Sequence, residues 1–141
     1  MSAKKGVELL KSVFDYASKS KGFSGCLKNF TVTSGGEGNC VAEFTVSEEH
    51  LNQGGGLHGG FTATIVDNVT TYALMTKDKH PGVTVDLHVS YMKAARLGDV
   101  VVVDAKTIRA GKTLAYLECE LRHKKDGSVI AKGTQTKYID L

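Results

Sequence analysis

Residues 57–77, LHGGFTATIVDNVTTYALMTK, are the one long internal segment whose apolar side chains recur at helical spacing. Phe61, Ile65, Val69 and Tyr72 follow one another at intervals of three or four residues, which brings them to one face of an α-helix. The stretch DKHPG, with the only proline of the chain, ends the pattern. The sequence therefore predicts one long internal helix.

After this helix the apolar period changes to two, which is typical of strands. Val83, Val85, Leu87, Val89 and Tyr91 alternate with other residues and predict a strand with one apolar face. Short turns separate the strand-like runs, and SGGEGN indicates a hairpin before the helix. We expect a first helix over residues 3–19, two strands within 27–46, and four strands within 83–92, 99–108, 113–124 and 128–139.

The predicted order is helix, two strands, helix and four strands. Parallel strands need long crossover connections, so four late strands joined by short turns are not a parallel series. We expect an α+β fold in which a six-stranded antiparallel sheet wraps its apolar face around the central helix.

Composition excludes several classes of protein. The chain has 141 residues and a net charge of +3, without the basic tract of a nucleic-acid-binding protein. No apolar run reaches the length of a membrane span, and the N-terminus has no apolar run typical of a secretory signal. Its composition favours an ordinary first helix over a mitochondrial transit peptide, which stays open as the alternative. Three scattered cysteines argue against a disulfide framework and a zinc site, and indicate free thiols in a reducing compartment.

The stretch HLNQGGGLHGG, residues 50–60, contains the pattern Gly-x-Gly-x-x-Gly at Gly54, Gly56 and Gly59. A dinucleotide-binding loop would follow a buried strand, whereas VSEEHLNQ is polar, and no Lys-Ser or Lys-Thr follows as in a P-loop. The glycines instead precede a helix, whose first N–H groups lack intrahelical partners. Gly59 and Gly60 would let a ligand approach donors able to hold an oxyanion, although a tight packing turn remains an alternative.

Asp67 is a carboxylate inside an otherwise apolar helix, on a face with Gly60, Ala63 and Thr71. It lies roughly 10–12 Å along the helix axis from Gly59 and Gly60, so one chain does not bring the two together. A dimer could place Asp67 of one subunit near Gly59 of another. No Gly-x-Ser-x-Gly motif indicates a serine hydrolase, and the neighbouring histidines lack further zinc ligands at fitting spacing.

Four segments resemble the hotdog-fold acyl-CoA thioesterases, including animal members and those of the bacterial phenylacetate pathway. The first contains the pattern Asn-x(5)-His-Gly-Gly-x(6)-Asp, formed by Asn52, His58, Gly59, Gly60 and Asp67. The resemblance covers nearly the whole chain and implies a single hotdog thioesterase domain over residues 1–141, with an N-terminal helix. The segments are HLNQGGGLHGGFTATIVDNVTTYAL (50–74), GVTVDLHVSYMKAARLGD (82–99), GKTLAYLECEL (111–121) and AKGTQTK (131–137).

The resemblance also implies site residues. Gly59 would donate its N–H to the thioester carbonyl, and Asp67 of the partner subunit would act as general base or nucleophile. Asn52 and His58 would support the same site, and the hydroxyl of Thr84 would orient Asp67 or the water. The acyl pocket would involve Phe61, Tyr72 and Met75. Coenzyme A would contact Asp86, Tyr91, Met92, Lys93, Ala94, Ala95, Arg96, Arg109, Ala110, Gly111, Lys112, Thr113, Leu114 and Lys137.

We therefore expect hydrolysis of medium- or long-chain fatty acyl-CoA, with no metal or other cofactor and no nucleic-acid partner. The resemblance implies dimers that pair into tetramers, in the cytoplasm, the mitochondrion or both. Two alternatives stay open: a hotdog hydratase or dehydratase acting on acyl thioesters, and a non-catalytic acyl-CoA-binding regulatory module.

Overall fold

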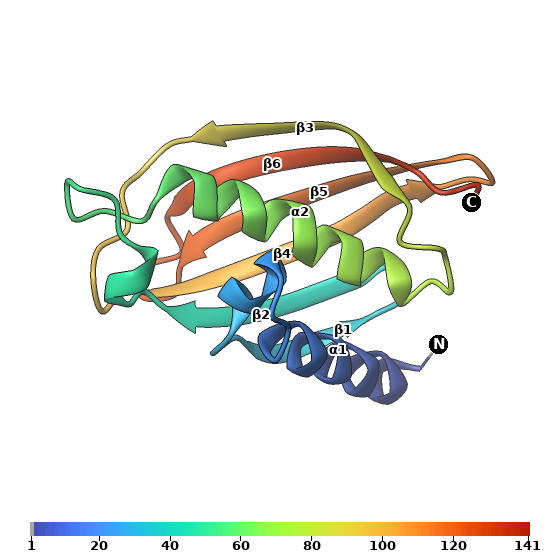
Figure 1. Cartoon of the computed structure of the whole chain (residues 1–141), viewed down its shortest axis with the longest axis horizontal. Helices are drawn as coiled ribbons and strands as arrows, with labels where there is room; N and C mark the ends of the chain where they lie inside the picture. Colours follow the sequence, from blue (N-terminus) through green and yellow to red (C-terminus); the bar gives the residue numbers. More distant parts are fainter. Residues whose placement is uncertain (1) are drawn as a thin grey trace.

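The computed structural model describes residues 2–141, and these residues form two α-helices and one six-stranded sheet (Figure 1). Both helices and all six strands lie where the sequence predicts them. Two short 3₁₀ helices, which the sequence does not predict, precede β1 and α2. The elements are α1 (Ala3–Ser18), η1 (Phe23–Leu27), β1 (Thr31–Gly36), β2 (Asn39–Thr45), η2 (Glu48–His50), α2 (Gly59–Met75), β3 (Val83–Tyr91), β4 (Val100–Ala110), β5 (Leu114–His123) and β6 (Val129–Tyr138).

The strand order is β1-β2-β4-β5-β6-β3, and every pair is antiparallel. Helix α2 lies across the concave face of this sheet, which confirms the predicted α+β arrangement (Figure 1). Ile65, Val66 and Val69 of the helix are fully buried. The helix comes close to β6 at Gly133, where an added Cβ would lie only 2.6 Å from Val66 Cγ1.

At the β1 edge, α1 packs against the sheet (Figure 1). Leu10 is fully buried, and its Cδ1 occupies the space that a side chain at Gly35 would need. Phe14 lies edge-on to Tyr72 of α2 and stacks with Phe30. Aromatic rings therefore fill the half of the core nearest β1. Neither helix of the described chain is long and apolar enough to cross a membrane.

At the opposite edge, β3 is paired on one side only, with β6. Val83, Val85 and Tyr91 are each more than half exposed. The strand departs from the simple alternation that the sequence predicts, because Val85 is an extra residue between the pairs Thr84–Lys137 and Asp86–Thr136. This bulge turns Thr84 toward the helix side of the sheet, the side that Leu87 also faces.

Candidate active site

The glycine loop before α2 is closed by its own hydrogen bonds. The N–H of Asn52 donates to Gly56 O at 2.8 Å, and Asn52 Oδ1 accepts from the N–H groups of Gly54 and Gly56. Gly55, with φ of +82°, adopts a left-handed conformation that favours glycine. Because Oδ1 is used inside the loop, Nδ2 is the group of Asn52 left to meet a substrate or water.

His58 is the N-cap of α2. Its Nδ1 accepts from the N–H groups of Gly60 at 2.9 Å and Phe61 at 3.3 Å. Two N–H donors require a lone pair on Nδ1, so the neutral ring carries its proton on Nε2. An added Cβ at Gly60 would lie 2.9 Å from His58 Cε1, so glycine permits this close cap. His58 therefore supports the start of the helix directly.

The N–H of Gly59 is left without an acceptor within residues 2–141. Its own carbonyl accepts a hydrogen bond from the hydroxyl of Tyr91 at 2.7 Å. The free donor points from the positive end of the helix dipole, where negative charge on a ligand is stabilised. An open hollow of about 580 Å³ adjoins it, lined by Leu51, Asn52, Gln53, Gly54 and His58.

Asp67 lies eight residues further along α2 and is partly buried. Its carboxylate makes neither a hydrogen bond nor an ion pair with any residue the structure describes. At 1.5 Å per residue, it lies about 12 Å along the axis from Gly59. Within one chain, therefore, the predicted donor and the predicted base stand apart.

A buried polar network holds the backbone of Asp67. Gln135 of β6 is 1% exposed, and its Nε2 donates to Asp67 O and to Thr70 Oγ1. Thr84 donates its hydroxyl hydrogen to Gln135 Oε1. Thr84 thus reaches Asp67 through Gln135, which sequence reasoning missed. No local pattern in the sequence marks Gln135 as buried, because its strand has no clear apolar face.

Lys137, which the resemblance assigned to coenzyme A, lies in the same network. Its side chain is 5% exposed, and Nζ donates to Thr71 Oγ1 at 2.8 Å. The Thr71 hydroxyl in turn donates to Asp67 O at 2.8 Å. Burial lowers the pKa of the Lys137 ammonium, and the charge of Asp67 opposes that shift.

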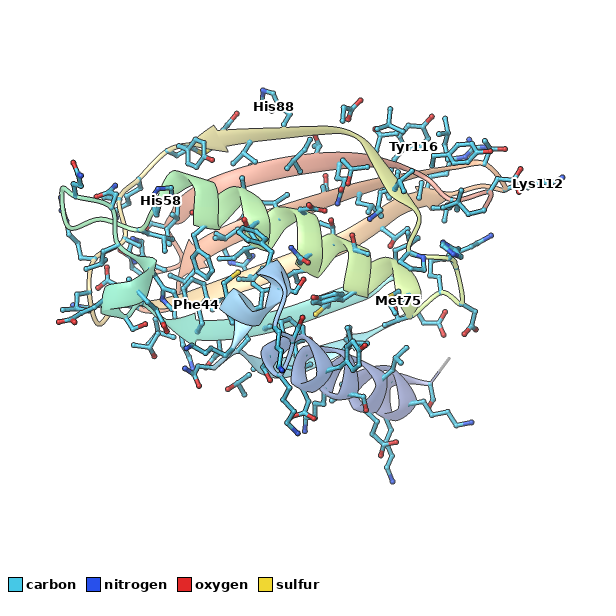
Figure 2. The ribbon with its side chains drawn as sticks, in the orientation of Figure 1. Phe44, His58, Met75, His88, Lys112 and Tyr116 are labelled. Carbon is cyan, nitrogen blue, oxygen red and sulfur yellow. The ribbon has the colours of Figure 1, made fainter. Side chains whose placement is uncertain are left out.

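The predicted coenzyme A residues fall at two ends of the molecule. Tyr91–Arg96 runs beside the glycine loop: Ala95 O accepts from Leu57 N–H, and Gly56 forms a bridge with Arg96. The turn Arg109–Leu114 lies at the opposite end of the sheet, as the positions of His58 and Lys112 show in Figure 2. Asp86 pairs with Thr136, near the middle of the β3 edge.

The predicted acyl-pocket residues lie along α2. Phe61 stacks on the buried ring of His50, with centroids 4.5 Å apart, and stands edge-on to Phe44. Burial lowers the pKa of His50. Tyr72 is buried further along, and Met75 ends the helix at the far end from His58 (Figure 2). Only Phe61 of the three adjoins the glycine loop within this chain.

Known proteins are similar to this chain in sequence and fold. The profile of the Thioesterase superfamily matches residues 54–130, from the glycine loop into β6. Acyl-coenzyme A thioesterase 13 of Homo sapiens is 40% identical over 131 residues, which cover 92% of this chain and 94% of that one. The zebrafish thioesterase superfamily member 2 structure has a TM-score of 0.92 and 39% identity, covering 94% of this chain and 97% of its own.

The PaaI protein of the E. coli phenylacetic acid degradation operon shares the fold, with a TM-score of 0.78, 17% identity and 94% coverage of both chains. The fold and the relatives define a hotdog-type thioester hydrolase. The chain belongs to the Thioesterase superfamily, as its resemblance to the hotdog thioesterases predicted.

Proposed function

We propose that this enzyme hydrolyses acyl-CoA to a free acid and coenzyme A, with medium- and long-chain fatty acyl groups as substrates. The observation that carries the proposal is the pair of unused groups on α2, the Gly59 N–H and the Asp67 carboxylate. The name of the human relative, acyl-coenzyme A thioesterase 13, supports the choice of substrate.

In the proposed reaction, the Gly59 N–H donates to the thioester carbonyl oxygen and stabilises the oxyanion as it forms. Asp67 either takes a proton from the attacking water or attacks the carbonyl carbon itself to form an anhydride, which water then hydrolyses. In both routes the carbon–sulfur bond breaks and coenzyme A leaves as a thiolate. In the first route Asp67 returns the proton that it took from water to this thiolate, and in the second the thiolate takes a proton from solvent water. Asn52 Nδ2 and His58 lie beside the reacting carbonyl. The reaction uses no metal ion or other cofactor.

The donor and the carboxylate meet, in this proposal, across a dimer formed by β3. Its unpaired edge with exposed apolar side chains supports that interface. A two-fold axis would pair β3 antiparallel with its copy, so that Val83 of one strand lies beside Tyr91 of the other. Asp67 of the partner subunit would then lie in the same site as the Gly59 N–H of this chain.

The same pairing brings the two predicted coenzyme A segments together. Leu114 pairs with Tyr138, and Tyr138 pairs with Val83, so the Arg109–Leu114 turn belongs to the Val83 end of β3. Tyr91 marks the other end, beside Gly59. A partner's Arg109–Leu114 turn would therefore approach this chain's Tyr91–Arg96, and its basic side chains would face the phosphates.

The family resemblance supports pairing of such dimers into tetramers and a role in fatty acid metabolism. A cytoplasmic or mitochondrial location is supported by the three cysteines, which are all free, with Cys40 and Cys119 buried in the core. Such thiols suit a reducing compartment.

Asp67→Asn tests the chemistry. The substitution keeps size and polarity but removes the base, so we expect thiol release from acyl-CoA to fall by about 10²–10⁴-fold. Asp78→Asn, in the turn after α2, is the matched control and should leave turnover unchanged. Binding of acyl-CoA without thiol release by the unaltered protein would contradict hydrolysis, and near-normal turnover in Asp67→Asn would remove Asp67 from the mechanism.

Mixed dimers test the placement of Asp67. Asn52→Ala and Asp67→Asn should each be nearly inactive alone. If the partner supplies Asp67, a mixed dimer has one intact site, and random mixing restores about a quarter of the original activity. If each chain uses its own Asp67, mixing restores nothing.

A further inference from the structure

We propose that Tyr91 is a positioning residue that aims the Gly59 N–H at the substrate carbonyl. This inference rests on the proposed function and goes beyond the assignment of Tyr91 to the coenzyme A segment. The hydroxyl of Tyr91 and the imidazole of His58 hold the same peptide group from its two ends.

That peptide group joins Gly59 to Gly60. Its carbonyl oxygen accepts the hydrogen of the Tyr91 hydroxyl at 2.7 Å, and its N–H donates to His58 Nδ1 at 2.9 Å. The Tyr91 ring also lies over Gly59, because an added Cβ would meet Cε1 and Cζ at 3.5 Å. One side chain from β3 and one from the loop therefore fix the first peptide of α2.

The free donor belongs to the preceding peptide, between His58 and Gly59. Its carbonyl is already held, since Thr62 N–H donates to His58 O at 3.0 Å. The direction of the N–H then depends on the two backbone dihedrals of Gly59, a residue with wide conformational freedom at a helix end. Fixing the next peptide restricts those dihedrals, and a donor aimed in advance stabilises an oxyanion better than a mobile one.

Tyr91 is itself firmly placed. Its backbone pairs with Ala131 of β6, and the N–H groups of Met92 and Lys93 both donate to Ile130 O. The side chain therefore extends from a fixed strand end to the helix start, although it is 56% exposed. An exposed ring adds little to the core, so its contact with Gly59 indicates a role in the active site and not in stability.

The test is Tyr91→Phe, which keeps the ring and removes the hydroxyl. We expect kcat for acyl-CoA hydrolysis to fall about tenfold or more while KM changes less than about twofold. The variant loses the fixed direction of the Gly59 N–H, whereas the contacts that bind the substrate stay. Tyr16→Phe, on α1 and 83% exposed, is the matched control and should leave both constants unchanged. A raised KM with unchanged kcat would make Tyr91 a coenzyme A contact and overturn the proposal, as would no change in either constant.

A spectroscopic measurement separates this proposal from the proposed function. In the Asp67→Asn background, the C=O stretching band of a bound, ¹³C-labelled acyl-CoA reports how strongly the carbonyl is polarised. Adding Tyr91→Phe should return the band toward its position in water. An unmoved band would refute the role of Tyr91 and leave hydrolysis intact, whereas absence of thiol release by the unaltered enzyme would refute the proposed function first.

Discussion

The two edges of the sheet are built differently. At the β1 edge, α1 covers the strand and aromatic rings fill the space beneath it, including Phe14 and Phe30. At the β3 edge, the inner face carries the buried polar side chains of Gln135 and Lys137, and apolar side chains stand exposed on the strand itself. The β1 half is covered by a helix of the same chain, whereas the β3 half ends in an unpaired strand with exposed apolar side chains, which is what the proposed dimer requires.

The two edges therefore contribute differently, the β1 edge to stability and the β3 edge to chemistry. Burial of apolar surface stabilises the β1 half, as in any core. Buried polar groups are costly unless they are hydrogen-bonded, so a network beneath Asp67 is expected where a group must be held in place. We therefore expect substitutions at the β1 edge to change stability and substitutions at the β3 edge to change turnover.

The largest expected effect is on stability at the β1 edge. Leu10→Ala removes a fully buried side chain that fills the space beside Gly35, and should lower the free energy of unfolding by about 3 kcal/mol. Urea denaturation measures it, and the turnover of the folded fraction should stay the same. Lys11→Ala, the exposed neighbour, is the control. A large loss of turnover without a loss of stability would break the division between the two edges.

Much of this fold was predictable because local patterns specify it. The 3.6-residue period of α2, the two-residue period of β5 and the hairpin SGGEGN all act over short distances. The pairing of β3 with β6 joins distant segments, and the extra residue Val85 leaves no mark in composition. Those two features decide which side chains reach Asp67, and they depend on tertiary contacts.

The next largest effect is expected from Leu87→Asp on β3. A charge at this partly exposed position should prevent the proposed pairing, and separated chains should lose about 100-fold or more of their turnover. Light scattering reports the mass, and thiol release reports the activity. Thr31→Asp, at an exposed position on β1, should alter neither. An active monomer would disprove the shared site.

A smaller effect is expected from Gln135→Leu. The variant loses the hydrogen bonds to Asp67 O and Thr70 Oγ1, and leaves Thr84 without its acceptor. Of these three, only the hydrogen bond to Asp67 O acts directly on the catalytic residue. Its loss, about 0.5–1.5 kcal/mol, corresponds to a fall in kcat of up to about tenfold, with KM little changed. Thr134→Val, on the outward face of the same strand, is the comparison. Equal kcat values for the two variants would show that the network serves stability alone.

The candidate site was less predictable than the fold. The spacing of Asn52, His58, Gly59 and Asp67 lies in one short segment, and the sequence placed all four correctly on the loop and on α2. Gln135 is distant in the chain, and its strand, SVIAKGTQTKYI, shows no clear apolar face. A polar residue that is buried through tertiary pairing cannot be distinguished, by type, from one that faces water.

The smallest expected effect is a pH dependence from Lys137. Burial lowers the pKa of its ammonium in the folded protein below the ordinary value near 10.4, so protonation favours the unfolded chain. At neutral pH the buried, charged Lys137 therefore lowers the free energy of unfolding. This loss of stability disappears as the pH rises through the folded pKa toward 10.4. Over that range the urea midpoint of the unaltered protein should rise relative to that of Lys137→Met. The exposed lysines are common to both proteins, so their effect cancels in the difference. Parallel curves would mean that the Lys137 ammonium is as well solvated as a surface lysine. That result would contradict its burial in the polar network beneath Asp67.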